Sequence, residues 1–198
     1  PSSGKFTTKQ KEIYDIVAAA NNHVIEISRP GITYTDVHLS MARIMAQGLK
    51  DLNILKGDVD EIVANGAQAL MMPHGLGHNM GMDVHDMEDL GENYVGYDDT
   101  YKRSTQFGLG SLRMGKMLEK GHVITDEPGI YFIPALIEQW KREGTNAQFI
   151  NFDVLEKYYD FGGIRLEDDI LITEGGCRLL GSKRLPITTE DVEREMAH

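Results

Sequence analysis

Three of the seven histidines in this 198-residue sequence lie close together, at positions 74, 78 and 85. An imidazole nitrogen is a good ligand for a divalent metal ion, and the other ring nitrogen then needs an acceptor that fixes the tautomer. Glycines at positions 75, 77 and 81 disfavour a helix here, because each costs about 1 kcal/mol relative to alanine. We therefore predict an extended stretch from His74 to Asp86, with its backbone close to a ligand. The alternative is a set of structural histidines on a turn.

Glu127 is a second residue whose type and position could do chemistry. It ends the strand-like run His122–Glu127 and precedes Pro128-Gly129, a turn that would leave its carboxylate at a strand end. A carboxylate placed there can bind a metal ion or be solvated. Considered without the other candidate residues, Glu127 is better interpreted as solvated.

The second strand-like run, Ile164–Thr173, carries charge on one face. Side chains alternate at period two along a strand, so apolar residues fall on one face and Arg165, Glu167 and Asp169 on the other. A cation and two carboxylates on a mostly apolar strand are costly unless something binds them. They form either a buried ion-pair network or a metal ligand oriented by neighbouring charge.

Side chains of metal-ligand type thus occur at widely separated positions, which matches a site assembled across a sheet. The candidate ligands are His78, Glu127 and Glu167. Mixed imidazole and carboxylate ligation favours manganese, iron, cobalt or zinc over a soft-metal site.

The elements that must position these residues change in character along the chain. Helical periodicity predicts a helix over Lys9–Ile27 capped by Thr8. A second helix is predicted to open at Thr35-Asp36 and to be broken at Lys56-Gly57, and a shorter one to span Val59–Gln68. Strand-like runs follow, so the sequence predicts an α+β fold with an antiparallel sheet backed by helices. The polar, turn-rich segment Gly91–Leu109 is predicted to be a long surface loop.

Composition excludes several classes of function. Lys and Arg number 20 against 31 Asp and Glu, a formal net charge of −11 that argues against nucleic-acid binding. No apolar run is long enough for a membrane-spanning helix. The single cysteine, Cys177, excludes an internal disulfide framework. The length suits one domain or a large part of one.

Three motifs in the correct order resemble the pita-bread metallopeptidases of the Xaa-Pro peptidase group, the prolidases (Xaa-Pro dipeptidases) and aminopeptidases P. They are His74–Asp86, Thr125–Phe132 and Gly163–Asp169, and Gly4–Thr7 adds to the resemblance. The resemblance implies a partial pita-bread fold, with residues 1–198 as the C-terminal portion of the catalytic domain. It implies hydrolysis of the bond before proline in a di- or oligopeptide substrate.

The resemblance also implies a dinuclear site with five protein ligands and usually two Mn²⁺ ions, with Co²⁺, Zn²⁺ or Fe²⁺ as alternatives. His78 and Glu127 match ligands, Glu127 also handling the proton of water, and Glu167 matches the carboxylate that bridges both metals. His85 matches the histidine that contacts the substrate carbonyl, and His74 an accessory histidine at the mouth of the active site.

Two further stretches favour prolidase over aminopeptidase P. Arg113 in Ser111-Leu112-Arg113 matches the arginine that binds the free carboxylate of a dipeptide, a task that suits the guanidinium fork. Arg165 is assigned to substrate binding with it. The segment Ile133–Gly162 resembles the insertion of eukaryotic-type prolidases. The ordinary alternative for Arg113 is a solvated arginine in a loop.

The sequence also departs from the family pattern. The two aspartate ligands and one substrate histidine of the family are expected upstream of residue 1, so the 198-residue chain alone is expected to hold at most one weakly bound ion and to be inactive. Exposed sheet edges should favour self-association, and the resemblance implies a homodimer. Asp126 stands where relatives have an apolar residue and is expected to add negative charge beside the site.

Two other functions remain open. A pita-bread domain can be a non-catalytic peptide-binding module, although the retained histidines and glutamates argue against it. The metal-free creatine hydrolase shares the scaffold, and both retained glutamates argue against that activity too. We expect a cytoplasmic protein with no membrane partner.

Overall fold

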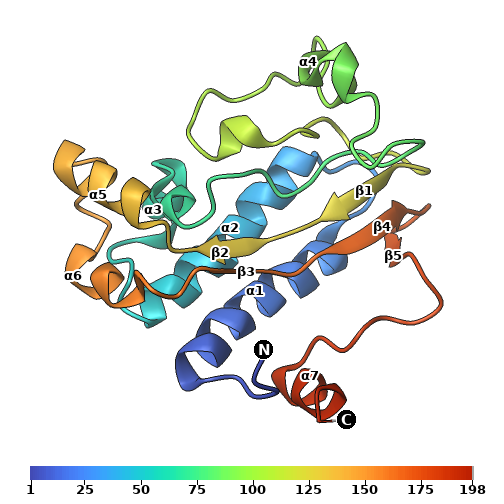
Figure 1. The fold of residues 1–198 in the computed structure, drawn as a ribbon. Coiled ribbons are helices and arrows are strands. Elements are labelled where there is room, and N and C mark those ends of the chain that lie inside the picture. Colours follow the sequence, from blue (N-terminus) through green and yellow to red (C-terminus); the bar gives the residue numbers. More distant parts are fainter. Residues whose placement is uncertain (198) are drawn as a thin grey trace.

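Two long helices at the N-terminal end support the rest of the chain (Figure 1). A computed structural model describes residues 1–197; His198, the last residue of the predicted domain, lies outside them. Helix α1 spans Thr8–Ile27 and α2 spans Tyr34–Asp51, and the two pack against each other. Both helices are confirmed, but their caps lie one or two residues earlier than predicted. The side chain of Thr7 accepts from the backbone N–H of Gln10, and that of Thr33 from the N–H of Asp36.

The third predicted helix, Val59–Gln68, is interrupted. Helix α3 spans only Val59–Ala64, and a 3₁₀ helix, η1, follows over Ala67–Leu70. Gly66 between them has φ 69°, a left-handed conformation that ends a helix and that glycine adopts without steric cost.

The strands form two small antiparallel sheets. In the first, β1 (Val123–Asp126) pairs with β4 (Asp168–Ile172), which pairs with β5 (Cys177–Leu179). In the second, β2 (Gly129–Tyr131) pairs with β3 (Gly163–Arg165). The predicted α+β class with an antiparallel sheet is confirmed.

The prediction of one strand over Ile164–Thr173 was wrong, because β3 and β4 are separated by Leu166 and Glu167. The partner run is broken at the same level, by Glu127 and Pro128 between β1 and β2. Proline has no N–H to donate to a strand ladder, and only its carbonyl bonds across, accepting from the N–H of Leu166 at 3.2 Å. Both candidate glutamate ligands therefore lie in the gap between the two sheets.

The hydrophobic core lies between the two long helices and the strands. Fully buried apolar side chains come from α1, α2 and the strands alike, among them Val17, Met41, Leu49, Ile130 and Ile170. The predicted apolar face of the second run is confirmed, since Ile164 and Leu166 pack against this core and Ile172 is buried in it. Within residues 1–197, no helix has the length and apolar character needed to span a membrane.

Irregular segments and short helices surround this framework. The predicted loop Gly91–Leu109 is irregular except for one helical turn, α4 (Glu92–Val95); η2 (Glu88–Leu90) precedes it and η3 (Leu109–Ser111) follows. Three helices occupy the segment 133–162: α5 (Pro134–Glu143), α6 (Phe152–Leu155) and η4 (Glu156–Tyr158). Helix α7 (Thr189–Glu195) lies near the N-terminal end of the chain (Figure 1).

The histidine-rich stretch is extended, as predicted, only over its first part, which lies directly against β1; beyond Met80 the chain turns back, and the N–H of Asp86 bonds to the carbonyl of Asn79. Backbone bonds join Glu127 to Leu76, Thr125 to His78 and Met80 to Val123. The backbones approach so closely at Gly77 that a Cβ atom there would lie 2.0 Å from the carbonyl oxygen of Thr125. Only glycine fits at this position.

We expect Gly77→Ala to lower the free energy of unfolding of the full-length protein by about 3 kcal/mol, because a methyl group would push the histidine stretch away from β1. Chemical denaturation measures the change. Gly175→Ala is the matched control: Gly175 has open space around its Cβ position, and a change below about 0.5 kcal/mol is expected. Similar effects of the two substitutions would contradict the steric argument.

Candidate active site

His78 is buried and held in one orientation by its own backbone neighbour. Its Nδ1 lies 2.9 Å from the carbonyl oxygen of Asn79, to which it can only donate. The neutral ring therefore keeps a lone pair on Nε2, and this atom lies 3.3 Å from Oε1 of Glu127. An imidazole whose other nitrogen is fixed in this way is arranged as metal-binding histidines are.

The Glu127 carboxylate is held at both oxygens. Oε1 accepts from the hydroxyl of Thr125 at 2.9 Å, and Oε2 accepts from Nη1 of Arg165 at 2.7 Å. The Thr125 hydroxyl also accepts the backbone N–H of His78 at 3.0 Å, so one side chain joins the two candidate ligands. A lone pair and a carboxylate oxygen facing each other are stabilised by a proton or a cation between them, so this donor set fits a divalent metal ion.

Glu167 lies near this pair in the gap between the sheets. Burial and the nearby charge of Glu127 raise the pKa of its carboxyl, with Arg165 and His78 opposing the shift. Residues 1–197 nevertheless contain no group of three His, Cys, Asp or Glu side chains close enough together to hold a metal ion. The structure thus brings His78 and Glu127 into contact but does not complete the predicted trio, because the carboxylates repel each other and Arg165 pairs with Glu127.

The two other candidate histidines flank His78. Burial lowers the pKa of His74, whose Nδ1 lies 2.7 Å from the carbonyl oxygen of Gly75 and whose Nε2 lies 3.4 Å from Nη2 of Arg165. His85 sets its ring edge-on to that of His78, with the ring centroids 4.3 Å apart. Its Nδ1 lies 3.0 Å from Oε2 of Glu88.

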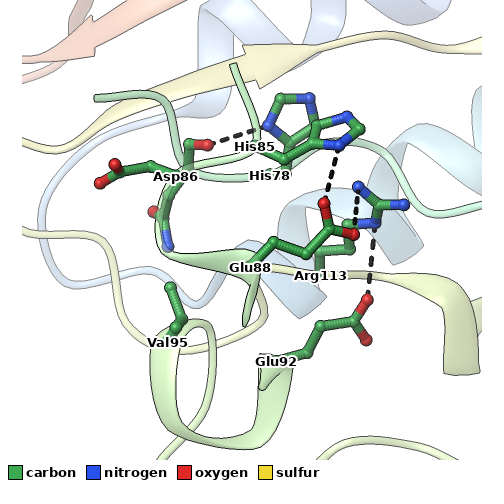
Figure 2. A pocket seen from close by; sticks show the side chains of 8 residues that line it. His78, His85, Asp86, Glu88, Glu92, Val95 and Arg113 are labelled. Atoms are coloured by element: carbon green, nitrogen blue, oxygen red, sulfur yellow. Dashed lines mark hydrogen bonds and ion pairs between the residues drawn. The ribbon is translucent and has the colours of Figure 1, made fainter. Parts of the chain in front are cut away.

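One cleft of about 200 Å³ joins most of the residues that the sequence singled out. Its lining includes His74, His78, His85, Arg113, Glu127 and Arg165. Two of the candidate metal ligands, His78 and Glu127, line it, and Arg113 reaches it from the segment before β1. Arg113 is not a solvated loop arginine: its guanidinium forms ion pairs with Glu88 and Glu92, at 3.1 and 3.5 Å (Figure 2).

The sequence predicts that Asp126 adds negative charge beside the site, and this prediction was wrong. Side chains alternate along β1, so Asp126 points away from Glu127 and is fully buried toward α1, where Oδ2 accepts from Nδ2 of Asn21 at 3.0 Å. The pKa of Asp126 is raised well above its usual range, mainly by burial and secondly by the negative charge of Asp168, which faces it on β4. Its uncharged form is therefore favoured.

Sequence reasoning missed Thr125 and Glu88. A signal for Thr125 existed, because it lies two residues before Glu127 and so shares its face of the run. Glu88 had no such signal for Arg113: it pairs with His85 three residues before it, but it reaches Arg113 only in three dimensions.

We expect Thr125→Val in the full-length protein to weaken metal binding by roughly tenfold or more, because the hydroxyl orients His78 and Glu127 together. The lost hydrogen bonds should also cost about 2 kcal/mol of stability. Metal titration followed by calorimetry measures the affinity. Thr125→Ser keeps the hydroxyl and should retain most of it; equal losses in both variants would refute the role of the hydroxyl.

Comparison with known proteins agrees with this geometry. The model of metallopeptidase family M24 matches residues 2–174. Human Xaa-Pro dipeptidase is 39% identical over 197 residues, which is 100% of this chain and 38% of that protein. The "Probable Xaa-Pro aminopeptidase pepP" of Sclerotinia sclerotiorum is 42% identical over 176 residues, 89% of this chain and 31% of that protein. The chain thus spans about two fifths or less of the length of these relatives.

Solved structures agree with the sequence matches. Zinc-substituted aminopeptidase P of Escherichia coli, in complex with product, superposes with a TM-score of 0.70 at 36% identity over 98% of this chain and 36% of that chain. Pseudomonas aeruginosa aminopeptidase PepP gives a TM-score of 0.72 at 32% identity over 100% of this chain and 36% of that chain. These matches confirm the pita-bread fold expected from the motifs, and the chain belongs to metallopeptidase family M24.

Proposed function

We propose that the full-length protein is a dinuclear-metal Xaa-Pro peptidase that hydrolyses the peptide bond before proline, with dipeptides as preferred substrates. One observation carries this proposal. A single cleft is lined by both the His78–Glu127 pair and Arg113. The names of the relatives support a peptidase of this class, since they include both dipeptidases and aminopeptidases.

Family membership implies divalent metal ions, and we propose Mn²⁺, with Co²⁺, Zn²⁺ or Fe²⁺ as alternatives. This chain would contribute His78, Glu127 and Glu167 as ligands. Two bound metal ions would supply the activation of water at neutral pH and the polarisation of the scissile carbonyl.

The side chains of this chain then have separate tasks. Glu127 takes the proton of the attacking water and passes it to the leaving nitrogen. His85 donates to the substrate carbonyl oxygen and stabilises its developing charge. Arg113 pairs with the free carboxylate of the product-side proline. His74 and Arg165, which lie 3.4 Å apart, line the cleft where the substrate enters.

The preference for dipeptides rests on Arg113, because a guanidinium fork recognises a carboxylate that a longer peptide does not offer at that place. The alternative is an aminopeptidase P that acts on longer peptides, as the names of several relatives suggest. A non-catalytic peptide-binding module is disfavoured, because the candidate ligands His78 and Glu127 face each other in the cleft.

A cytoplasmic location and a homodimeric assembly are proposed with this function. The single cysteine offers no disulfide framework of the kind that oxidising compartments favour. The dimer is inferred from the resemblance alone. The acidic net charge is consistent with peptide substrates and argues against nucleic acid as a partner.

Removal and return of metal test the proposed function. We expect chelation of the full-length protein to abolish hydrolysis of alanyl-proline and added Mn²⁺ to restore it. Glu167→Gln should lower both bound metal and kcat, the latter at least about a hundredfold. Glu174→Gln is the control, because Glu174 is exposed and, within residues 1–197, its one ion pair is with Lys120 at 3.6 Å. Undiminished hydrolysis by the metal-free protein would contradict the proposal.

We expect Arg113→Ala to lower kcat/KM for a dipeptide by roughly tenfold to a hundredfold, the cost of losing a hydrogen-bonded charge partner. The loss should be smaller for a tripeptide with the same first two residues, whose carboxylate lies further along the chain. Initial rates on the two peptides give the comparison. Equal losses would remove the argument for a dipeptidase and favour the aminopeptidase alternative.

A further inference from the structure

The carboxylate of Glu88 bridges two of the residues assigned to the substrate. Oε2 lies 3.0 Å from Nδ1 of His85, and Oε1 lies 3.1 Å from Nη1 of Arg113 (Figure 2). Glu88 therefore pairs with Arg113, the same arginine that is proposed to bind the carboxylate of a dipeptide.

The second carboxylate at this arginine has a different environment. Oε1 of Glu92 lies 3.5 Å from Nε of Arg113, while its Oε2 lies 2.7 Å from Nη1 of Arg103. Glu92 therefore keeps a cation if Arg113 turns to another partner. Glu88 is also the more exposed of the two, at 43% against 22%, and so it regains water more readily when it leaves.

The backbone around Glu88 is lightly anchored. None of the three residues of η2 is buried. Residues with positive φ stand at both ends, Met87 at 56° and Gly91 at 92°. A short exposed helix between two such turns can be displaced at low cost, because little buried apolar surface is lost.

Little room remains beside this contact. The cavity bounded by His78, His85, Glu88 and Arg113 has a volume of about 20 Å³, enough for about one water molecule. Arg113 also lines the larger cleft, and a carboxylate that enters from there can pair with Nη1 only by taking the place of the Glu88 carboxylate.

From these contacts we infer that Glu88 determines specificity by competing with the free carboxylate of the substrate for Arg113. This inference deepens the proposed function and rests on it for the identity of the substrate. Dipeptides must displace Glu88 from Arg113 to bind. A peptide whose C-terminus is amidated has no carboxylate to pair with Arg113, so Glu88 does not affect its binding. The competition weakens the enzyme's preference for the smallest substrates.

Glu88→Gln tests the competition, because it removes the charge and keeps the size of the side chain. In the full-length, metal-loaded protein, we expect KM for alanyl-proline to fall about threefold, the scale of a partly exposed ion pair. The ratio of kcat/KM for alanyl-proline to that for alanyl-prolinamide should rise by a similar factor. Asp89→Asn is the matched control, since Asp89 is exposed in the same short helix and should leave the ratio unchanged.

Binding of free proline gives a readout that does not require hydrolysis. Calorimetric titration should show tighter proline binding in Glu88→Gln than in the wild type, and the gain should vanish in the double variant Glu88→Gln/Arg113→Gln. An increase in KM or weaker proline binding would mean that Glu88 instead positions Arg113, and no change would mean that it does neither; both results overturn the inference.

The two proposals fail in different ways. A wild-type protein without Xaa-Pro hydrolysis whose Glu88→Gln variant binds proline more tightly would refute the proposed function and keep the competition. An active wild type whose Glu88→Gln variant has the same KM and the same proline affinity would keep the proposed function and refute the competition.

Discussion

The close approach of the histidine stretch to β1 is the constraint on which the rest of the site depends. Gly77 lets the two backbones meet where any Cβ atom would collide with the carbonyl of Thr125. That contact brings the N–H of His78 to the Thr125 hydroxyl, which in turn donates to Glu127. A single hydroxyl therefore sets the orientation of two candidate ligands from segments almost fifty residues apart. If the stretch moved away from β1, the ligand pair and the neighbouring His85 would separate with it.

Strand alternation sorts the acidic residues around this point into two environments. Glu127 and Glu167 lie in the gap between the sheets, where Arg165 partly balances their charge, and Glu127 lines the cleft. Asp126 and Asp168, one position away, face α1 instead, where Arg184 holds Asp168 at 2.7 Å. The acids that could bind a cation are thus kept apart from those that tie the sheet to the first helix. Adjacent carboxylates in one sequence serve different purposes because their side chains leave opposite faces of the strand.

The far side of the cleft is built from irregular chain rather than from strands. Arg113 reaches the site from the segment before β1, and the carboxylates that meet it come from η2 and α4. This gives the two halves of the site unequal rigidity: the candidate ligands lie beside paired strands, whereas Arg113, the candidate substrate arginine, is paired with a lightly anchored helix. A family of enzymes can change its substrate preference through such a segment without altering the metal ligands.

The sequence by itself determined the first helices, the positions of the two strand-like runs, the α+β class and most of the candidate residues, because helical periodicity, glycine spacing and strand alternation are local properties. The extended path of His74–Met80 followed from glycine spacing, and the apolar face of Ile164–Ile172 followed from period two. Only the tertiary structure decided that this run breaks at Glu167, since the break depends on Pro128 in the opposite strand. It alone placed Asp126 against α1, brought Glu88 to Arg113, and left Glu167 outside a complete group of ligands. Those outcomes depend on which distant segments face each other, and no local pattern of residues records that.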